Sequence, residues 1–294
     1  VAGKANMPGA DFSGAALAKA QLTGSDLSGA NLTHAGMQQA DLTGADVTAA
    51  TFEGADLTRI RATKACLKEA DLTGADLTGA DLAGADLDDA IFEKSCLTEA
   101  ILDQATAVSA VFSECDLSRA FLKQGTFDKA DFSGATLVEA NFQGSSLREA
   151  SIQGANGPRI NMDRTDLTEL RASEGGDFSQ GSFKEARGKE SIWSTAKLDR
   201  ADFSFSEMER ADFTSASLRE ANLYAANMKF ARFVKAVLQK ARINMMNLFQ
   251  GSLEKADLSG ADLSGSNMYG VEFLDAKLAG ATGRNVNLKM TKLK

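Results

Sequence analysis

Residues that commonly build catalytic and metal sites are scarce in this chain of 294 residues. It contains one histidine, three cysteines, two prolines, one tryptophan and two tyrosines. No cluster of Cys and His has the spacing of a zinc site, and no phosphate-binding glycine loop precedes a helical pattern. The one histidine, His34, falls at an outward position of the pattern described below. We therefore expect no metal, no cofactor, no small-molecule substrate and no enzymatic activity.

Long apolar runs are absent as well. No segment approaches the roughly 18 apolar residues that suggest a membrane span, and no signal peptide is recognisable at the N-terminus. The three cysteines are odd in number, and Cys66 and Cys96 fall on opposite sides of the coil proposed below. We expect reduced thiols in a cytoplasmic protein.

A five-residue repeat occupies nearly the whole chain. The stretch ADLTGADLTGADLAGADLDDA, residues 70–90, gives nearly the same word four times. A large apolar residue forms the centre of each word, and a small residue stands two positions before it. Centres recur from Met7 to Ala172 and from Phe178 to Leu293, which gives 34 and 24 words, 58 in all. One extra residue within 173–177 separates the two series and predicts a local bulge.

A period of five fits neither a helix of 3.6 residues per turn nor a strand of period two. If the centre and the small residue point inward, each word turns one corner, and four words close a square coil of twenty residues. Every fourth centre then shares one side, and nine of the fifteen centres on one side are aromatic, against five of the other 43. This side comprises Phe12, Leu32, Phe52, Leu72, Phe92, Phe112, Phe132, Ile152, Ala172, Trp193, Phe213, Phe233, Leu253, Phe273 and Leu293. Because the column continues past 173–177, we expect one solenoid domain over residues 1–294.

The words ADLTG, ADLSG, ANLTH and ADFSG resemble those of the pentapeptide-repeat family. The resemblance covers nearly the whole chain, and a register held over so many words is highly specific. It implies an all-β fold, a right-handed quadrilateral parallel β-helix with about four pentapeptides per coil.

An acidic segment runs from Glu69 to Glu93 and contains no lysine or arginine. Successive words lie on successive sides, so its eight acids form a belt around the coil: Glu69, Asp71, Asp76, Asp81, Asp86, Asp88, Asp89 and Glu93. Such a surface suits a protein built to hold DNA phosphates. The family includes Qnr-like proteins that mimic DNA, bind gyrase and protect it from fluoroquinolones, so the resemblance implies this function as an alternative. The simpler alternative is that Asp suits the wall and keeps the chain in solution.

A second candidate surface is basic and aromatic. No acid lies between Glu220 and Glu254. The interval carries Tyr224, Lys229, Phe230, Arg232, Lys235, Lys240, Arg242 and Phe249. Exposed aromatics often mark protein contacts, and bases mixed with aromatics also bind nucleic acid. Because the chain has a net charge of −8, we expect a protein partner or a merely solvated surface here, and not nucleic acid.

The charge is unevenly spread along the chain. Residues 1–172 hold 14 Lys and Arg against 25 Asp and Glu, a net of −11, and residues 173–294 hold 18 against 15, a net of +3.

The words also leave no room for polar caps, which predicts end-to-end self-association or a capping domain. We expect a rigid non-catalytic scaffold for protein–protein interaction, a module of a larger bacterial protein. Analogy with the family extends this expectation to type VI secretion and to secreted effectors.

Overall fold

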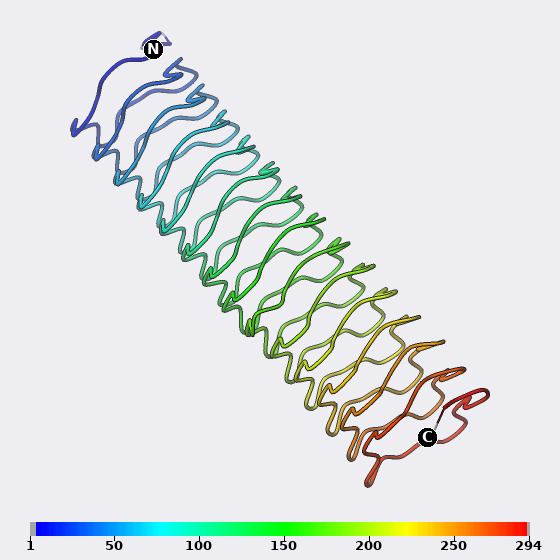
Figure 1. The fold of residues 1–294 in the computed structure, drawn as a ribbon. Coiled ribbons are helices and arrows are strands. Elements are labelled where there is room, and N and C mark those ends of the chain that lie inside the picture. The colour runs from blue at the N-terminus through cyan, green and yellow to red at the C-terminus, as the bar shows by residue number, and fades with distance from the viewer. Residues whose placement is uncertain (1–3, 293–294) are drawn as a thin grey trace. The chain divides into compact units, whose positions relative to one another are not determined.

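The computed structural model describes residues 4–292. The chain divides into two compact units, Val1–Ala150 and Ser151–Lys294. In each unit the backbone winds through a stack of similar coils (Figure 1). The two units are described separately below as unit 1 and unit 2.

Each unit is a quadrilateral parallel β-helix, which confirms the fold expected from the sequence. Within residues 4–292 there is no helix and no extended strand, because each word contributes a single residue to a parallel bridge. In unit 1 the bridges join residues twenty apart, from Asn6 with Asp26 to Thr126 with Ser146. Four words therefore make one coil, and the outward residue before each centre is in register with its counterpart in the next coil.

Backbone hydrogen bonds satisfy four of the five N–H groups of a word, as the word centred on Leu72 shows. The N–H of Asp71 donates to the carbonyl of Ala50 at 3.0 Å, and the N–H of Leu72 donates to Ile91 at 2.7 Å. Gly74 donates to the carbonyl of Glu93 at 2.9 Å, and the next word begins with a turn in which Ala75 donates to Leu72 at 3.0 Å. Every coil is thus bonded to the coils before and after it.

In many words a side chain satisfies the fifth N–H, and this explains why Asp or Asn so often precedes the centre. The carboxylate of Asp71 accepts a hydrogen bond from the backbone N–H of Thr73 at 2.9 Å, and Asp76 does the same for Thr78 at 2.9 Å. Asn serves equally, since the amide oxygen of Asn31 accepts from Thr33 at 3.1 Å. Short polar side chains that bond their own backbone two residues on are typical of Asx turns.

Some words without Asp or Asn at this position take the acceptor from the preceding coil. The word Thr106–Ala107–Val108 is an example, because the N–H of Val108 donates to the carboxylate of Asp88 at 2.9 Å. Four further words bond to an Asp one position after a centre in the preceding coil: Asp103 with Lys123, Asp128 with Arg148, Asp163 with Lys184 and Asp199 with Arg219. Asp can therefore accept a backbone hydrogen bond both from the position before a centre and from the position after it.

The corner between two words requires a left-handed backbone two residues after the centre. Gly74 has a φ of 65° there and Gly79 a φ of 64°, a conformation that glycine adopts without steric cost. Other residues also occupy this position, including Glu69 at 55° and Asp89 at 58°. For L-residues this conformation costs roughly 1–2 kcal/mol, and the hydrogen bonds of the corner hold it in place.

The centres fill the interior of each unit, and the predicted aromatic column is present in both. In unit 1 the rings of Phe92 and Phe112 stack with centroids 4.8 Å apart, and Phe112 and Phe132 stack at 4.8 Å. In unit 2 Phe213 and Phe233 stack at 4.9 Å. The column also includes Trp193, fully buried, whose indole N–H donates to the hydroxyl of Ser191 at 2.9 Å. The last residue expected in the column, Leu293, lies outside the described residues.

Unit 2 contains the extra residue of the repeat. Ser151 bridges Arg171 at a separation of twenty, whereas Arg171 bridges Ile192 at a separation of twenty-one. From Asp177 with Lys197 onward the separation is again twenty. The turn at Glu174 and Gly175 accommodates the additional residue, and it leaves the bridges on both sides intact.

Replacing Asp76 with Ala is expected to destabilise unit 1 by about 1 kcal/mol, because the N–H of Thr78 loses its acceptor. Asp76→Asn is the matched control: it removes the charge but keeps an oxygen acceptor, and it should leave stability nearly unchanged. Urea unfolding followed by circular dichroism measures both variants. Equal destabilisation by Ala and Asn would show that charge, and not the turn hydrogen bond, is what matters.

Stability should also fall in acid. The Ser259 hydroxyl and backbone N–H hold the pKa of Asp257 below its usual value, and Ser264 does the same for the pKa of Asp262. A carboxyl with a lowered folded pKa contributes stability that is complete above its unfolded pKa, near 3.9, and that is lost as the pH falls through the folded pKa. Urea midpoints measured between about pH 6 and pH 2 should fall less steeply in Asp257→Asn/Asp262→Asn. An unchanged slope in this double variant would contradict the assignment.

Candidate protein-binding surfaces

The described residues carry several hollows, none of which is lined by a cluster of potential metal ligands. Two apolar hollows are lined by core centres, one of about 230 Å³ that includes Met7 and Phe12 and one of about 400 Å³ that includes Leu263 and Phe273. Within residues 4–292 no group of three or more His, Cys, Asp or Glu residues is placed to hold a metal ion. The same residues contain no helix that could cross a membrane.

The three cysteine thiols are free. Cys66 lies 3.2 Å from the hydroxyl of Thr48, and Cys96 lies 3.2 Å from that of Thr78. Cys115 is buried, and burial raises the pKa of its thiol to about 11. Since the thiolate is the nucleophilic form, the Cys115 thiol is inert at neutral pH.

The predicted acidic belt lies in unit 1, and its main members are spread over all four walls of one coil. Asp71, Asp76, Asp81 and Asp86 belong to four successive words, so the structure does not bring them together. Asp88 and Asp89 follow Asp86 on the same wall. Each of the four leading acids accepts the turn hydrogen bond of its own word.

Lysines just outside the acidic segment neutralise part of the belt. Lys68 lies 3.3 Å from the carboxylate of Asp86 and 3.8 Å from that of Asp88. At the other end Lys94 pairs with Glu93 at 2.7 Å. Asp86 and Lys68 belong to consecutive coils, which is why the charge of a linear segment overstates the charge of the surface. The belt is thus a structural element whose net field is weaker than its eight acids indicate.

The predicted basic and aromatic residues lie in unit 2 and are likewise spread around the coil. Tyr224 and Arg242 share one wall, where the guanidinium carbon of Arg242 lies 4.6 Å from the ring centroid of Tyr224. Lys229, Phe230 and Phe249 lie on the next wall. Arg232 and Lys235 follow on the third wall, and Lys240 belongs to the fourth. They form no single basic patch.

The wall that carries Lys229 has a distinct composition, and we call it the amide wall. It consists of the words 227–230, 247–250, 267–270 and 287–290, stacked by bridges between residues twenty apart. An asparagine precedes every centre, and the amides form a ladder: Asn247 donates to Asn227 at 3.3 Å, Asn267 to Asn247 at 3.0 Å and Asn287 to Asn267 at 2.9 Å. No Asp or Glu occurs in these four words.

Aromatic rings run beside the ladder. Phe249 and Tyr269 stack with centroids 5.4 Å apart and an interplanar angle of 10°, and Phe230 meets Phe249 edge-on at 5.8 Å. The guanidinium carbon of Arg210 lies 5.6 Å from the centroid of Phe230. All three rings are partly exposed. Tyr269 and the asparagine ladder were not among the candidates from sequence, although comparison of positions twenty apart would have found them.

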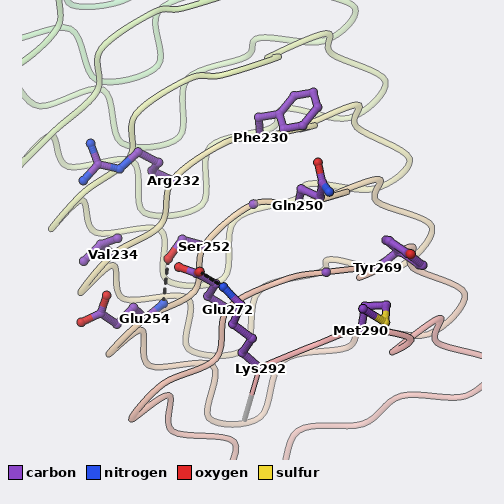
Figure 2. Close-up of a pocket in the computed structure, with 12 residues that line it drawn as sticks. Phe230, Arg232, Val234, Gln250, Ser252, Glu254, Tyr269, Glu272, Met290 and Lys292 are labelled. Carbon is purple, nitrogen blue, oxygen red and sulfur yellow. Dashed lines mark hydrogen bonds and ion pairs between the residues drawn. The ribbon is translucent and has the colours of Figure 1, made fainter. Parts of the chain in front are cut away.

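A groove of about 580 Å³ opens at the corner between the amide wall and the next wall (Figure 2). Phe230, Gln250, Tyr269 and Met290 line it on the side of the amide wall. On the other side Glu272 pairs with Lys292 at 2.8 Å. Its lining is therefore mixed, with aromatic and thioether groups facing an ion pair.

Gly251 keeps the backbone beneath this groove close to the preceding coil. A Cβ on Gly251 would lie 2.7 Å from the carbonyl oxygen of Ala231 and 2.5 Å from a methyl of Leu248. Only glycine fits this inward position without a shift of the backbone.

Solved structures that resemble this chain include HetL, QnrB1 and Rfr23. HetL, a pentapeptide repeat protein involved in heterocyst differentiation regulation in the cyanobacterium Nostoc sp. strain PCC 7120, is 27% identical; the match covers 80% of this chain and 88% of HetL, with a TM-score of 0.43. QnrB1, a plasmid-mediated fluoroquinolone resistance protein, is 20% identical over 64% of this chain and 91% of its own, with a TM-score of 0.39. Rfr23, a pentapeptide repeat protein from the cyanobacterium Cyanothece 51142, is 21% identical over 51% of this chain and 91% of its own, with a TM-score of 0.23. With TM-scores below 0.5, these likenesses assign no function to this chain.

No curated protein sequence matches the chain. The family model for pentapeptide repeats, in contrast, matches most of it. The matched segments are 3–33, 20–59, 65–104, 95–134, 108–144, 126–168, 196–232, 216–253 and 247–282. Together with the twenty-residue coils of both units, this match shows that the chain belongs to the pentapeptide-repeat family.

Proposed function

We propose that this protein is a non-catalytic β-solenoid scaffold and that it binds a protein partner through the amide wall of unit 2. The observation that carries the proposal is the partly exposed ring cluster of Phe230, Phe249 and Tyr269, of which Phe230 and Tyr269 line a groove of about 580 Å³. Aromatic residues are enriched at protein interfaces and are frequent among the residues that dominate binding energy.

The construction of the wall favours a binding role. Its shape is fixed by inter-coil hydrogen bonds, such as that from the N–H of Phe230 to the carbonyl of Phe249 at 2.9 Å. A partner would meet rings and amides that are already ordered, so less conformational entropy is lost on binding. Behind the wall, its own centres Met228, Leu248 and Met268 are fully buried and fill the interior.

We also propose one repeat domain for the whole chain. The five-residue pattern runs from Leu147 to Ile152 without interruption, and the extra residue falls later, within 173–177. This proposal rests on the sequence pattern alone.

A DNA-mimicking gyrase binder is the second candidate function. One observation favours it: Asp71, Asp76 and Asp81 point out from three walls of one coil, and none of them has an ion pair within residues 4–292. The pairing of Lys68 with Asp86 and Asp88 weakens the same surface. We therefore rank this function below the scaffold.

For the scaffold, the prediction is that Phe249→Ser/Tyr269→Ser abolishes capture of a partner protein. The immobilised wild-type chain and the variant are exposed to the same cell extract, and retained proteins are quantified by mass spectrometry. The matched control is Ile101→Ser/Phe121→Ser, which removes two exposed apolar side chains, 37% and 40% exposed, from unit 1. At least one protein should be retained by the wild type and the control but not by the variant. Identical retention by all three chains would contradict the proposal.

For the alternative, the prediction concerns supercoiling by purified gyrase with and without a fluoroquinolone. If the acidic belt mimics DNA, the chain inhibits or protects gyrase, and Asp71→Asn/Asp76→Asn/Asp81→Asn/Asp86→Asn loses the effect, more so at low salt. Asn keeps the turn hydrogen bonds, so the quadruple variant should remain folded. No effect of the wild-type chain at tens of micromolar would remove this function for the gyrase tested.

A further inference from the structure

Four residues on the amide wall form a column in which two rings are bracketed by two lysines. Lys229, Phe249, Tyr269 and Lys289 occupy the same position in four consecutive coils. Their register is fixed by the backbone, since the N–H groups of Phe230, Gln250 and Gly270 donate to the carbonyls of Phe249, Tyr269 and Lys289 at 2.9, 2.8 and 2.9 Å. The column is therefore a fixed pattern of charge, ring, ring and charge.

Most ion pairs of unit 2 join residues of neighbouring coils. Within residues 4–292, neither Lys229 nor Lys289 has such a counter-ion. The four words of the wall contain no acid, and Glu209, which occupies the position of Lys229 one coil earlier, makes no ion pair with it. Lys289 is exposed, Lys229 is partly exposed, and both are available to an incoming carboxylate. The wall is thus electrostatically complementary to a ligand with two negative charges.

The spacing of the lysines sets the spacing of those charges. Lys229 and Lys289 are three coils apart, and at the strand spacing of roughly 4.8 Å this separation is about 14 Å. An extended polypeptide rises roughly 3.3 Å per residue, so residues four apart span about 13 Å. Side chains at positions i, i+2 and i+4 of an extended chain point to the same face. Acids at i and i+4 therefore meet the lysines while the side chain at i+2 meets the rings.

The asparagine ladder adds hydrogen-bonding groups beside this column. Each amide nitrogen of Asn247, Asn267 and Asn287 uses one N–H for the ladder. An asparagine amide carries a second N–H, and for these three no further acceptor is found within residues 4–292. These N–H groups are available to the carbonyls of an extended backbone.

We propose that the amide wall binds an extended protein segment with the pattern acid–x–apolar–x–acid. This proposal rests on the scaffold function proposed above and specifies the partner. Lys229 and Lys289 bind the two carboxylates, and the edges of Phe249 and Tyr269 contact the apolar side chain between them. Single-stranded nucleic acid fits less well, because bases stack on free ring faces, and one face each of Phe249 and Tyr269 is covered by the other ring.

The test uses two labelled peptides of identical composition, SEVFVES and SVEFEVS, titrated with the whole chain by fluorescence anisotropy. In the first peptide the glutamates are four apart and share a face with Phe; in the second they are two apart and lie on the opposite face. The first should bind with a Kd below about 1 mM, and the second at least about tenfold more weakly. Lys229→Glu/Lys289→Glu should weaken binding of the first peptide by at least about tenfold.

The matched control is Lys235→Glu/Lys240→Glu, which changes the net charge equally on two other walls and should bind the first peptide like the wild type. Equal binding of both peptides, equal loss in the control, or tighter binding of a single-stranded DNA oligonucleotide would each overturn the proposal. Absence of peptide binding would overturn it too. Suppose that no peptide binds, but that the Phe249→Ser/Tyr269→Ser variant fails to capture a protein that the wild-type chain retains from the cell extract. The scaffold function would then stand, and only the proposed motif would fail.

Discussion

The structure depends on one constraint: the backbone groups that point along each stack must find partners in the coils before and after. Bridges between residues twenty apart meet this requirement wall by wall. Four N–H groups of each word donate to backbone carbonyls, so the fifth N–H needs another acceptor. Asp or Asn before the centre supplies it in many words, as Asp71 does for Thr73. The acidic composition of the chain follows in part from this local need.

The packed interior and the hydrogen bonds of the turns determine which residue types most positions of a word can hold. A binding function therefore depends on the outward residues that neither the interior nor a turn requires. The acidic belt is a poor candidate on this criterion, since Asp76 and Asp81 are engaged by their own backbones. Phe249, Tyr269 and Lys289 are better candidates. Their side chains serve neither the core nor a turn, and they recur on one wall at the same position of the word.

The sequence alone predicts the features that follow from its period. It identifies Leu72 as an inward centre, the aromatic column with Phe112 and Phe213, and the extra residue near Glu174. These signals are available because a solenoid converts spacing along the chain directly into position on a wall. The square coil of four words could be predicted for the same reason, whereas the all-β fold class was implied by the resemblance to the pentapeptide-repeat family.

Contacts between coils were harder to predict, because neighbours in space are separated by about one coil in sequence. A linear segment beginning at Glu69 omits Lys68, which pairs with Asp86 eighteen residues later. The capping of Val108 by Asp88 depends on a side-chain conformation that no spacing specifies. The basic and aromatic candidates were chosen in the same linear way, and the structure distributes them over four walls.

The register decides which outward residues share a wall, so the most direct measurement is a disulfide test of that register across the extra residue. In a background of Cys66→Ser, Cys96→Ser and Cys115→Ala, cysteines are placed at Arg171 and Ile192, which the structure bridges at a separation of twenty-one. Mild oxidation followed by mass spectrometry should show an intramolecular disulfide in this chain. The same test with Arg171→Cys and Ser191→Cys, twenty apart, should show little. Efficient crosslinking of the second pair and not the first would contradict the register and the walls built on it.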